Sequence, residues 1–136
     1  MTIQTIYFEF ETREETPRIS APEEFSELLG AATTMDERDE ITVMIDYPLD
    51  KPYKMTIRRK PITVESFARA VADAYKAIYC EEARTSQIPE DRLSAMSLNR
   101  NKTNGKYGIW GHGMGDLYLE GAVRQDDGTW RLLIGS

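Results

Sequence analysis

Residues 63–84, TVESFARAVADAYKAIYCEEAR, decide how this chain folds. Successive residues of an α-helix are about 100° apart around the axis, so side chains three and four positions apart share a face. Seven apolar or aromatic side chains fall in one such stripe: Val64, Phe67, Ala68, Val71, Tyr75, Ile78 and Tyr79. Thr63 is a residue type that caps helices, and Glu65 suits the first turn. The segment therefore predicts one long amphipathic helix with a face that must be buried.

A second strip of this helix carries the small side chains Ala70, Ala74 and Ala77. Small side chains let another backbone approach closely. This strip is therefore expected either to be covered by the rest of the domain or to pair with a second copy of the chain. Cys80 falls opposite the apolar stripe and is expected near the surface.

Five segments have the composition or the alternation of β-strands, in which successive side chains point to opposite faces. They are residues 3–10, 41–46, 53–59, 116–123 and 129–134. Turn-forming residues at 47–52 (YPLDKP) and 125–128 (QDDG) separate two pairs of these strands. Each pair is expected to form a hairpin.

The remaining segments predict short helices and connectors. Residues 22–30 predict a short helix that buries Phe25, Leu28 and Leu29, and residues 89–98 have the pattern of another. The charge run at 36–40 (DERDE) is interpreted as a solvated connector, and residues 99–106 as a basic, mobile loop.

These elements predict an α+β protein with a mostly antiparallel sheet of about five strands. The sheet packs on the one long helix, with one or two short helices beside it. The chain has 136 residues, 40% of them hydrophobic and 29% charged. That length suits one core, so residues 1–136 are expected to form a single globular domain.

Charge and cysteine content restrict the setting in which the protein acts. Residues 1–50 carry 13 acidic and 3 basic side chains, whereas residues 51–136 carry 10 acidic and 14 basic ones, so the net charges are −10 and +4. An acidic chain argues against general nucleic-acid binding. The only cysteine cannot form an intramolecular disulfide, and neither a signal peptide nor a long apolar run is evident. An intracellular, cytoplasmic protein without a membrane segment is expected.

The most unusual stretch is GIWGHGMG at 108–115, with four glycines in eight residues. It precedes a predicted strand and lacks the lysine of a phosphate-binding loop, so it does not predict a nucleotide site. His112 is the only histidine, and Asp116 follows four residues later. The two could act as a general acid/base pair, together with Tyr107, in hydrolysis or proton transfer. One histidine and one cysteine do not make a usual zinc site, and no cofactor or metal is predicted.

Basic and aromatic side chains cluster in two places and suggest binding surfaces. The candidate binding residues are Arg58 and Arg59 in one cluster and Arg100, Lys102, Lys106, Tyr107 and Trp110 in the other. The loop at 100–106 could bind a single-stranded nucleic acid, with phosphates on its cations and bases stacked on its aromatic rings. The same aromatic rings could instead anchor a protein partner.

The run at 106–121, KYGIWGHGMGDLYLEG, resembles a short signature of small uncharacterised proteins of large DNA viruses that infect amoebae and algae. The likeness covers 16 of 136 residues. It implies a viral or host-interaction setting and no particular activity. Such proteins often have an acidic residue where this chain has Gly113, so the resemblance assigns no charge-dependent role to that position.

The sequence therefore leads to a non-catalytic protein-interaction module that binds another protein or itself. Two alternatives stay open: a small enzyme that uses His112 and Asp116, and a single-stranded nucleic-acid binder that uses the basic loop.

Overall fold

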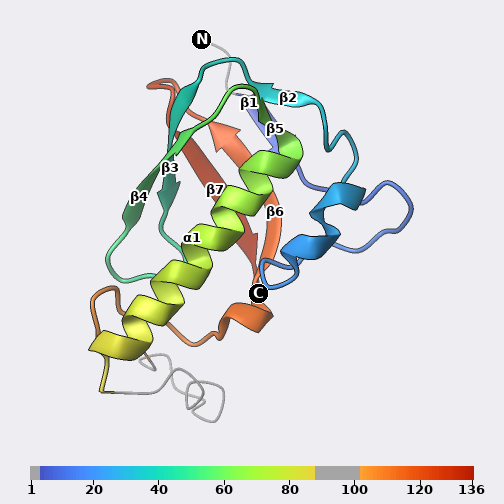
Figure 1. The fold of residues 1–136 in the computed structure, drawn as a ribbon. Helices are drawn as coiled ribbons and strands as arrows, with labels where there is room; N and C mark the ends of the chain where they lie inside the picture. The colour runs from blue at the N-terminus through green and yellow to red at the C-terminus, as the bar shows by residue number, and fades with distance from the viewer. Residues whose placement is uncertain (1–3, 88–101) are drawn as a thin grey trace.

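The computed structural model describes residues 4–87 and 102–136 and has a mixed α+β fold (Figure 1). A five-stranded sheet has the strand order β1-β6-β7-β3-β4. Its strands are β1 (Gln4–Tyr7), β3 (Glu40–Ile45), β4 (Tyr53–Arg58), β6 (Tyr118–Arg124) and β7 (Trp130–Gly135), and the long helix α1 (Val64–Thr85) crosses one face. The predicted fold class is confirmed. The helix predicted over residues 89–98 lies outside the described residues.

Both predicted hairpins form, because β3 pairs antiparallel with β4 and β6 pairs antiparallel with β7. β1 adds antiparallel to β6, and a parallel pairing of β3 with β7 joins the two halves of the sheet. This order places β4 at one edge and β1 at the other. A separate two-stranded sheet, β2 (Thr34–Asp36) with β5 (Ile62–Thr63), was not predicted, since strands of three and two residues are too short to show an alternation.

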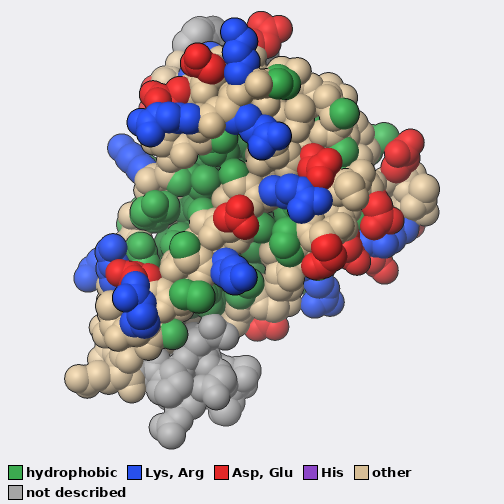
Figure 2. All heavy atoms as spheres, in the orientation of Figure 1, with side chains coloured by type: hydrophobic (Ala, Val, Ile, Leu, Met, Phe, Trp, Pro, Cys, Tyr) green, Lys and Arg blue, Asp and Glu red, His purple; other side chains and the backbone are tan. Residues whose placement is uncertain are grey.

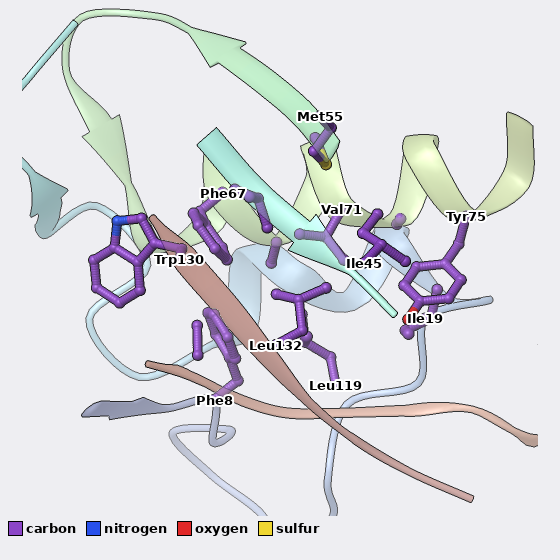
Figure 3. Packing of buried hydrophobic residues seen from close by; sticks show 14 of the residues in the cluster. Phe8, Ile19, Ile45, Met55, Phe67, Val71, Tyr75, Leu119, Trp130 and Leu132 are labelled. Carbon is purple, nitrogen blue, oxygen red and sulfur yellow. The ribbon is translucent and has the colours of Figure 1, made fainter. Parts of the chain in front are cut away.

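α1 begins where the sequence predicts because Thr63 caps it. The Thr63 hydroxyl accepts a hydrogen bond from the backbone N–H of Ser66, and the Ser66 hydroxyl accepts one from the N–H of Thr63. All seven residues of the predicted stripe are buried, and Cys80 is exposed, as predicted. Figure 3 shows the stripe meeting the sheet, where the ring centroids of Phe67 and Trp130 are 5.7 Å apart.

A β-bulge explains which side chains of β6 reach this core. Leu119 lies opposite Ile134 and Gly121 lies opposite Leu133, so β6 has one extra residue at this point. The extra residue shifts the alternation, and Ala122 rather than Gly121 faces the core with Leu119. Gly121 lies opposite Tyr7 of β1 and has no room for a side chain, since a Cβ there would lie 2.6 Å from the carbonyl oxygen of Ile6.

Replacing Gly121 by alanine is expected to lower the free energy of unfolding by about 1–3 kcal/mol, because the new methyl group would push β1 away from β6. Gly115→Ala is the matched control: a Cβ there meets nothing within 4 Å. It is expected to change stability by no more than about 0.5 kcal/mol. Urea unfolding of both variants measures the difference, and equal losses would contradict the packing argument.

Residues 22–30 contain the predicted short helix as a 3-10 helix, η1 (Pro22–Glu27). Phe25 and Leu28 are buried as predicted, but Leu29 is 55% exposed. The prediction for Leu29 was wrong because the helical turn ends at Glu27 and Leu28 is already extended, so α-helical spacing no longer applies. The N–H of Leu29 instead donates to the carbonyl of Glu9 at 2.7 Å.

The charge run at 36–40 is not simply the solvated connector that its composition predicts. Asp36 is 3% exposed. Its carboxylate accepts hydrogen bonds from the Trp130 indole N–H at 2.9 Å and from the Arg38 guanidinium at 2.7 and 3.0 Å. Arg38 also donates to the carbonyl of Gly128, in the turn between β6 and β7, at 2.9 Å. Asp36 and Arg38 therefore link the end of β2 to the β6–β7 hairpin through these hydrogen bonds.

Candidate functional site

The predicted binding residues lie in two groups near opposite ends of α1. Arg58 and Arg59 border a hollow together with Thr63, at the start of the helix. The described residues of the second group, Lys102, Lys106, Tyr107 and Trp110, belong to the segment that packs at the end of the helix. Arg100 lies outside the described residues. Since α1 has 22 residues and is about 33 Å long, the two groups do not form one basic surface.

Glu82, near the end of α1, holds the segment 103–108 against the helix. Its carboxylate is buried and accepts hydrogen bonds from the Thr103 hydroxyl at 2.5 Å and from the N–H groups of Gly105, Tyr107 and Gly108 at 2.8, 2.7 and 3.2 Å. The Thr103 hydroxyl accepts in turn from the N–H of Ile109 at 2.8 Å. The described part of the predicted mobile loop, residues 102–106, is therefore tied down where it meets the helix.

The electrostatics of Glu82 follow from these contacts. Burial raises the pKa of its carboxyl group, but the hydrogen bonds from Thr103 and from three backbone N–H groups outweigh burial, so the pKa lies below its usual value. An ionised carboxylate only accepts hydrogen bonds, which suits four converging donors. The sequence holds one indication that Glu82 is buried. Around the helix axis, Glu82 falls between Ile78 and Tyr75, which both belong to the apolar stripe.

Tyr107 is not the exposed stacking residue that the sequence suggested. Only 8% of its surface is exposed, and its ring packs edge-on against Tyr53 with centroids 6.1 Å apart. Trp110 is half-buried. The ammonium group of Lys102 lies 4.9 Å from the Trp110 ring centroid, so this aromatic face already has a cation over it.

The cations of this second group have carboxylate partners. Lys102 lies 3.1 Å from a carboxylate oxygen of Asp50, and Lys106 lies 3.7 Å from one of Glu81. A phosphate would have to compete with these neighbours for the same charges. The geometry of this end of the molecule therefore does not favour nucleic-acid binding.

His112 and Asp116 are neighbours at the surface. Nδ1 of His112 is 4.0 Å from Oδ2 of Asp116, beyond hydrogen-bond distance. The same oxygen accepts from the N–H of Gly113 at 3.3 Å, at the start of the 3-10 helix η3 (Met114–Asp116). The Asp116 side chain is 57% exposed, and the His112 carbonyl accepts from the Tyr79 hydroxyl at 2.9 Å. These contacts describe a surface turn fastened to α1.

A different feature has the shape of a binding site: a hollow of about 550 Å³ between β4 and α1, here called the β4–α1 groove. Its lining residues are Met55, Thr56, Ile57, Arg58, Arg59, Thr63, Glu65, Ser66, Arg69, Ala70 and Asp73. Figure 2 shows hydrophobic side chains reaching the surface along the strip between β4 and α1. Ala70 is one of the three small residues Ala70, Ala74 and Ala77 on α1, and it lines the groove. The rest of the described chain therefore leaves α1 uncovered at Ala70.

β4 forms one wall of the groove with an open backbone edge. Its six residues pair with β3 on one side, and no other described strand pairs with them. A strand at the edge of a sheet presents a row of backbone N–H and C=O groups without partners. The inward side chains Met55 and Ile57 are buried beneath the groove. The site therefore combines open backbone, apolar floor and helix wall.

The charges of the groove are only partly compensated. Arg69 is paired with Glu65 at 2.7 Å, and Arg58 is paired across the sheet with Glu40 at 2.5 Å. Within the described residues, Arg59 and Asp73 form no ion pair. The groove thus has a spare positive charge near the start of α1 and a spare negative charge farther along. The sequence singled out Arg58 and Arg59 but gave no role to Asp73.

A second hollow, of about 520 Å³, lies beside β6 and differs in kind. Arg18 and Tyr118 are among its lining residues, and the Arg18 guanidinium is 5.0 Å from the Tyr118 ring centroid. The chain at 17–19 covers the adjacent backbone, because Leu119 N–H donates to the carbonyl of Pro17 and Ile19 N–H donates to that of Leu117. No open strand edge borders this hollow in the way that β4 borders the groove.

Residues 4–87 and 102–136 contain no cluster of three His, Cys, Asp or Glu side chains able to hold a metal ion. None of the helices in these ranges has the length and apolar character needed to span a bilayer. Comparison of the whole chain with protein-family models, with curated proteins and with solved structures finds no match, so the site must be interpreted from its own geometry.

Proposed function

We propose that this chain is a non-catalytic protein-interaction module that acts inside the cell and receives its partner in the β4–α1 groove. The observation that carries the proposal is the open edge of β4 beside a hollow with an apolar floor. Strand edges that are left open are templates for pairing with another chain. The single, exposed cysteine fits a reducing compartment.

The two alternatives have less support from geometry. An enzyme based on His112 and Asp116 needs a concave site around the pair, whereas both hollows described above are lined by other residues. Nucleic-acid binding through residues 100–106 needs available cations, whereas Lys102 and Lys106 are paired with carboxylates. Neither alternative has an observation of its own comparable to the open edge of β4.

The proposal is tested by selecting binders from a display library of random 12-residue peptides and titrating the best of them with variants. Ala70→Trp fills the groove and is expected to weaken binding at least about tenfold, a change of about 1.4 kcal/mol. Ala83→Trp is the matched control, since Ala83 is exposed on α1 and outside the groove lining. It is expected to bind as the unaltered chain does.

Circular dichroism checks that both tryptophan variants are folded. Asp73→Tyr provides a second obstruction, because Asp73 is exposed and its replacement does not disturb the core. A library that yields no binder, or binders that ignore both obstructions, would overturn the proposal.

A further inference from the structure

We propose that the occupant of the β4–α1 groove is an extended segment of a partner protein. It adds to β4 as an antiparallel strand and carries the pattern acidic–x–apolar–x–basic. This inference rests on the proposed function and specifies its ligand. Three features of the groove lead to it: the direction of β4, the spacing of the two uncompensated charges, and the apolar floor between them.

The backbone of β4 determines the conformation of the occupant. A peptide can satisfy the open N–H and C=O groups of an edge strand only if it is itself extended. Antiparallel pairing is the more stable arrangement per residue and is the one that β4 already makes with β3. Alternate side chains of an added strand then point into the space between β4 and α1, and the others point away.

The contacts at the two ends of β4 give the direction of the occupant. Tyr53, at the start of β4, packs against Tyr107, which is bound to Glu82 near the end of α1. Arg59, just after β4, shares the groove with Thr63, at the start of α1. β4 therefore runs opposite to α1. An antiparallel occupant runs along α1 in the same direction as the helix, and its N-terminal end lies at Arg59.

The charge spacing gives the positions of the two ionic residues. Thr63 lies at the same end of the groove as Arg59, so it marks the position of that charge along α1. Asp73 is ten residues beyond Thr63, which is about 15 Å along the helix axis at 1.5 Å per residue. An extended strand covers about 13 Å in four residues, and residues four apart point to the same side. A peptide whose acidic side chain meets Arg59 therefore brings the side chain four positions later to Asp73, where a lysine or arginine is complementary.

The middle of the groove selects the residue between these two. Met55 and Ile57 form the floor, and Ala70 forms the wall on α1. The side chain two positions after the acidic residue points to this floor. An aliphatic residue there buries apolar surface at roughly 25 cal/mol per Å², while a charged one would lose its hydration without a partner.

A second copy of the chain is the competing occupant. The described chain contains the pattern twice. Glu65, Phe67 and Arg69 are helical in α1, and Phe67 is buried. Glu120, Ala122 and Arg124 belong to β6, which is paired on both sides within the sheet. Ala122 also faces the core. The described chain therefore offers its own groove no free strand at either segment, and we expect a monomer at high concentration by light scattering after gel filtration.

The peptides selected from the 12-residue library test the inference directly. Enrichment of Asp or Glu, an aliphatic residue and Lys or Arg at spacings of two and four is expected. Arg59→Glu and Asp73→Lys are each expected to weaken the best peptide about tenfold or more. The double variant is expected to prefer a synthetic peptide with its acidic and basic residues exchanged. Rescue by exchange cannot arise from a loss of folding.

A second measurement isolates the backbone. Methylating the peptide nitrogens that face β4 removes donors without altering side chains, and it is expected to abolish binding, while methylating the alternate nitrogens is not. Peptides that keep their affinity after methylation and for both charge variants, yet bind Ala70→Trp more weakly, would overturn strand addition. That result would still support the proposed interaction module. A dimer that forms through β4 would also overturn the inference.

Discussion

Replacing Glu82 by alanine is expected to lower the free energy of unfolding by about 3–5 kcal/mol, because four donors that now converge on a buried carboxylate lose their acceptor. Three of those donors are backbone N–H groups of Gly105, Tyr107 and Gly108, which cannot turn towards water without moving the chain. We expect residues 103–109 to detach from α1. Urea unfolding measures the loss, and amide hydrogen exchange locates it.

The residue next to Glu82 supplies the control. The Glu81 side chain is partly exposed, and its carboxylate is paired with the exposed Arg84 and lies near the exposed Lys106. Exposed ion pairs contribute little, so Glu81→Ala is expected to cost no more than about 1 kcal/mol. A similar loss in both variants would mean that helix propensity or charge, rather than the converging donors, explains the effect. Faster exchange confined to the segment 103–109 in Glu82→Ala would support the anchoring role.

The elements that the sequence predicted are those whose pattern is longer than one turn or one alternation. The stripe of α1 has seven members over 16 residues, and all of them are buried. Both hairpins were predicted because turn residues separate two alternating segments. β2 and β5 were missed because two or three residues cannot show a period, and Leu29 was misplaced because a 3-10 helix does not follow α-helical spacing.

The candidate site was harder to predict because it depends on strand order. Local patterns identify β4 as a strand, but only the pairing of β3 with β7 makes β4 an edge. That pairing joins segments more than 80 residues apart, and no local rule gives it. Arg58, Arg59 and Ala70 were singled out as a basic cluster and a small-residue strip. Their meeting in one groove required the fold.

The same limitation applies to Asp36, whose contacts join segments that are far apart in the sequence. Its carboxylate is bound by Arg38, two residues away, and by the indole of Trp130, 94 residues away. Arg124 lies 3.9 Å from it. The carboxylate of Asp36 is therefore the shared partner of two guanidinium groups and one buried indole N–H. A run of five charged residues in the sequence gives no sign of which member turns inward.

Replacing Asp36 by alanine is expected to cost about 3–5 kcal/mol, because it leaves a partly buried guanidinium and the buried indole N–H without an acceptor. Trp130 is fully buried, so its fluorescence is expected to shift to longer wavelength if water enters at the indole. Glu37→Ala is the control: Glu37 is exposed and forms no ion pair within the described residues. It is expected to change stability by no more than about 0.5 kcal/mol.

The pH dependence of stability distinguishes the charge of Asp36 from its shape. Burial raises the pKa of this carboxyl group, but hydrogen bonds from Arg38 and Trp130 outweigh burial and hold the pKa well below its usual range. A depressed pKa means that the ionised form stabilises the fold above the unfolded pKa of about 3.9, and that this stability is lost as the pH falls below that value. Asp36→Asn keeps the shape without the charge. Its stability is therefore expected to fall less steeply than that of the unaltered chain between about pH 4 and pH 2, and parallel curves would contradict the role assigned to the charge.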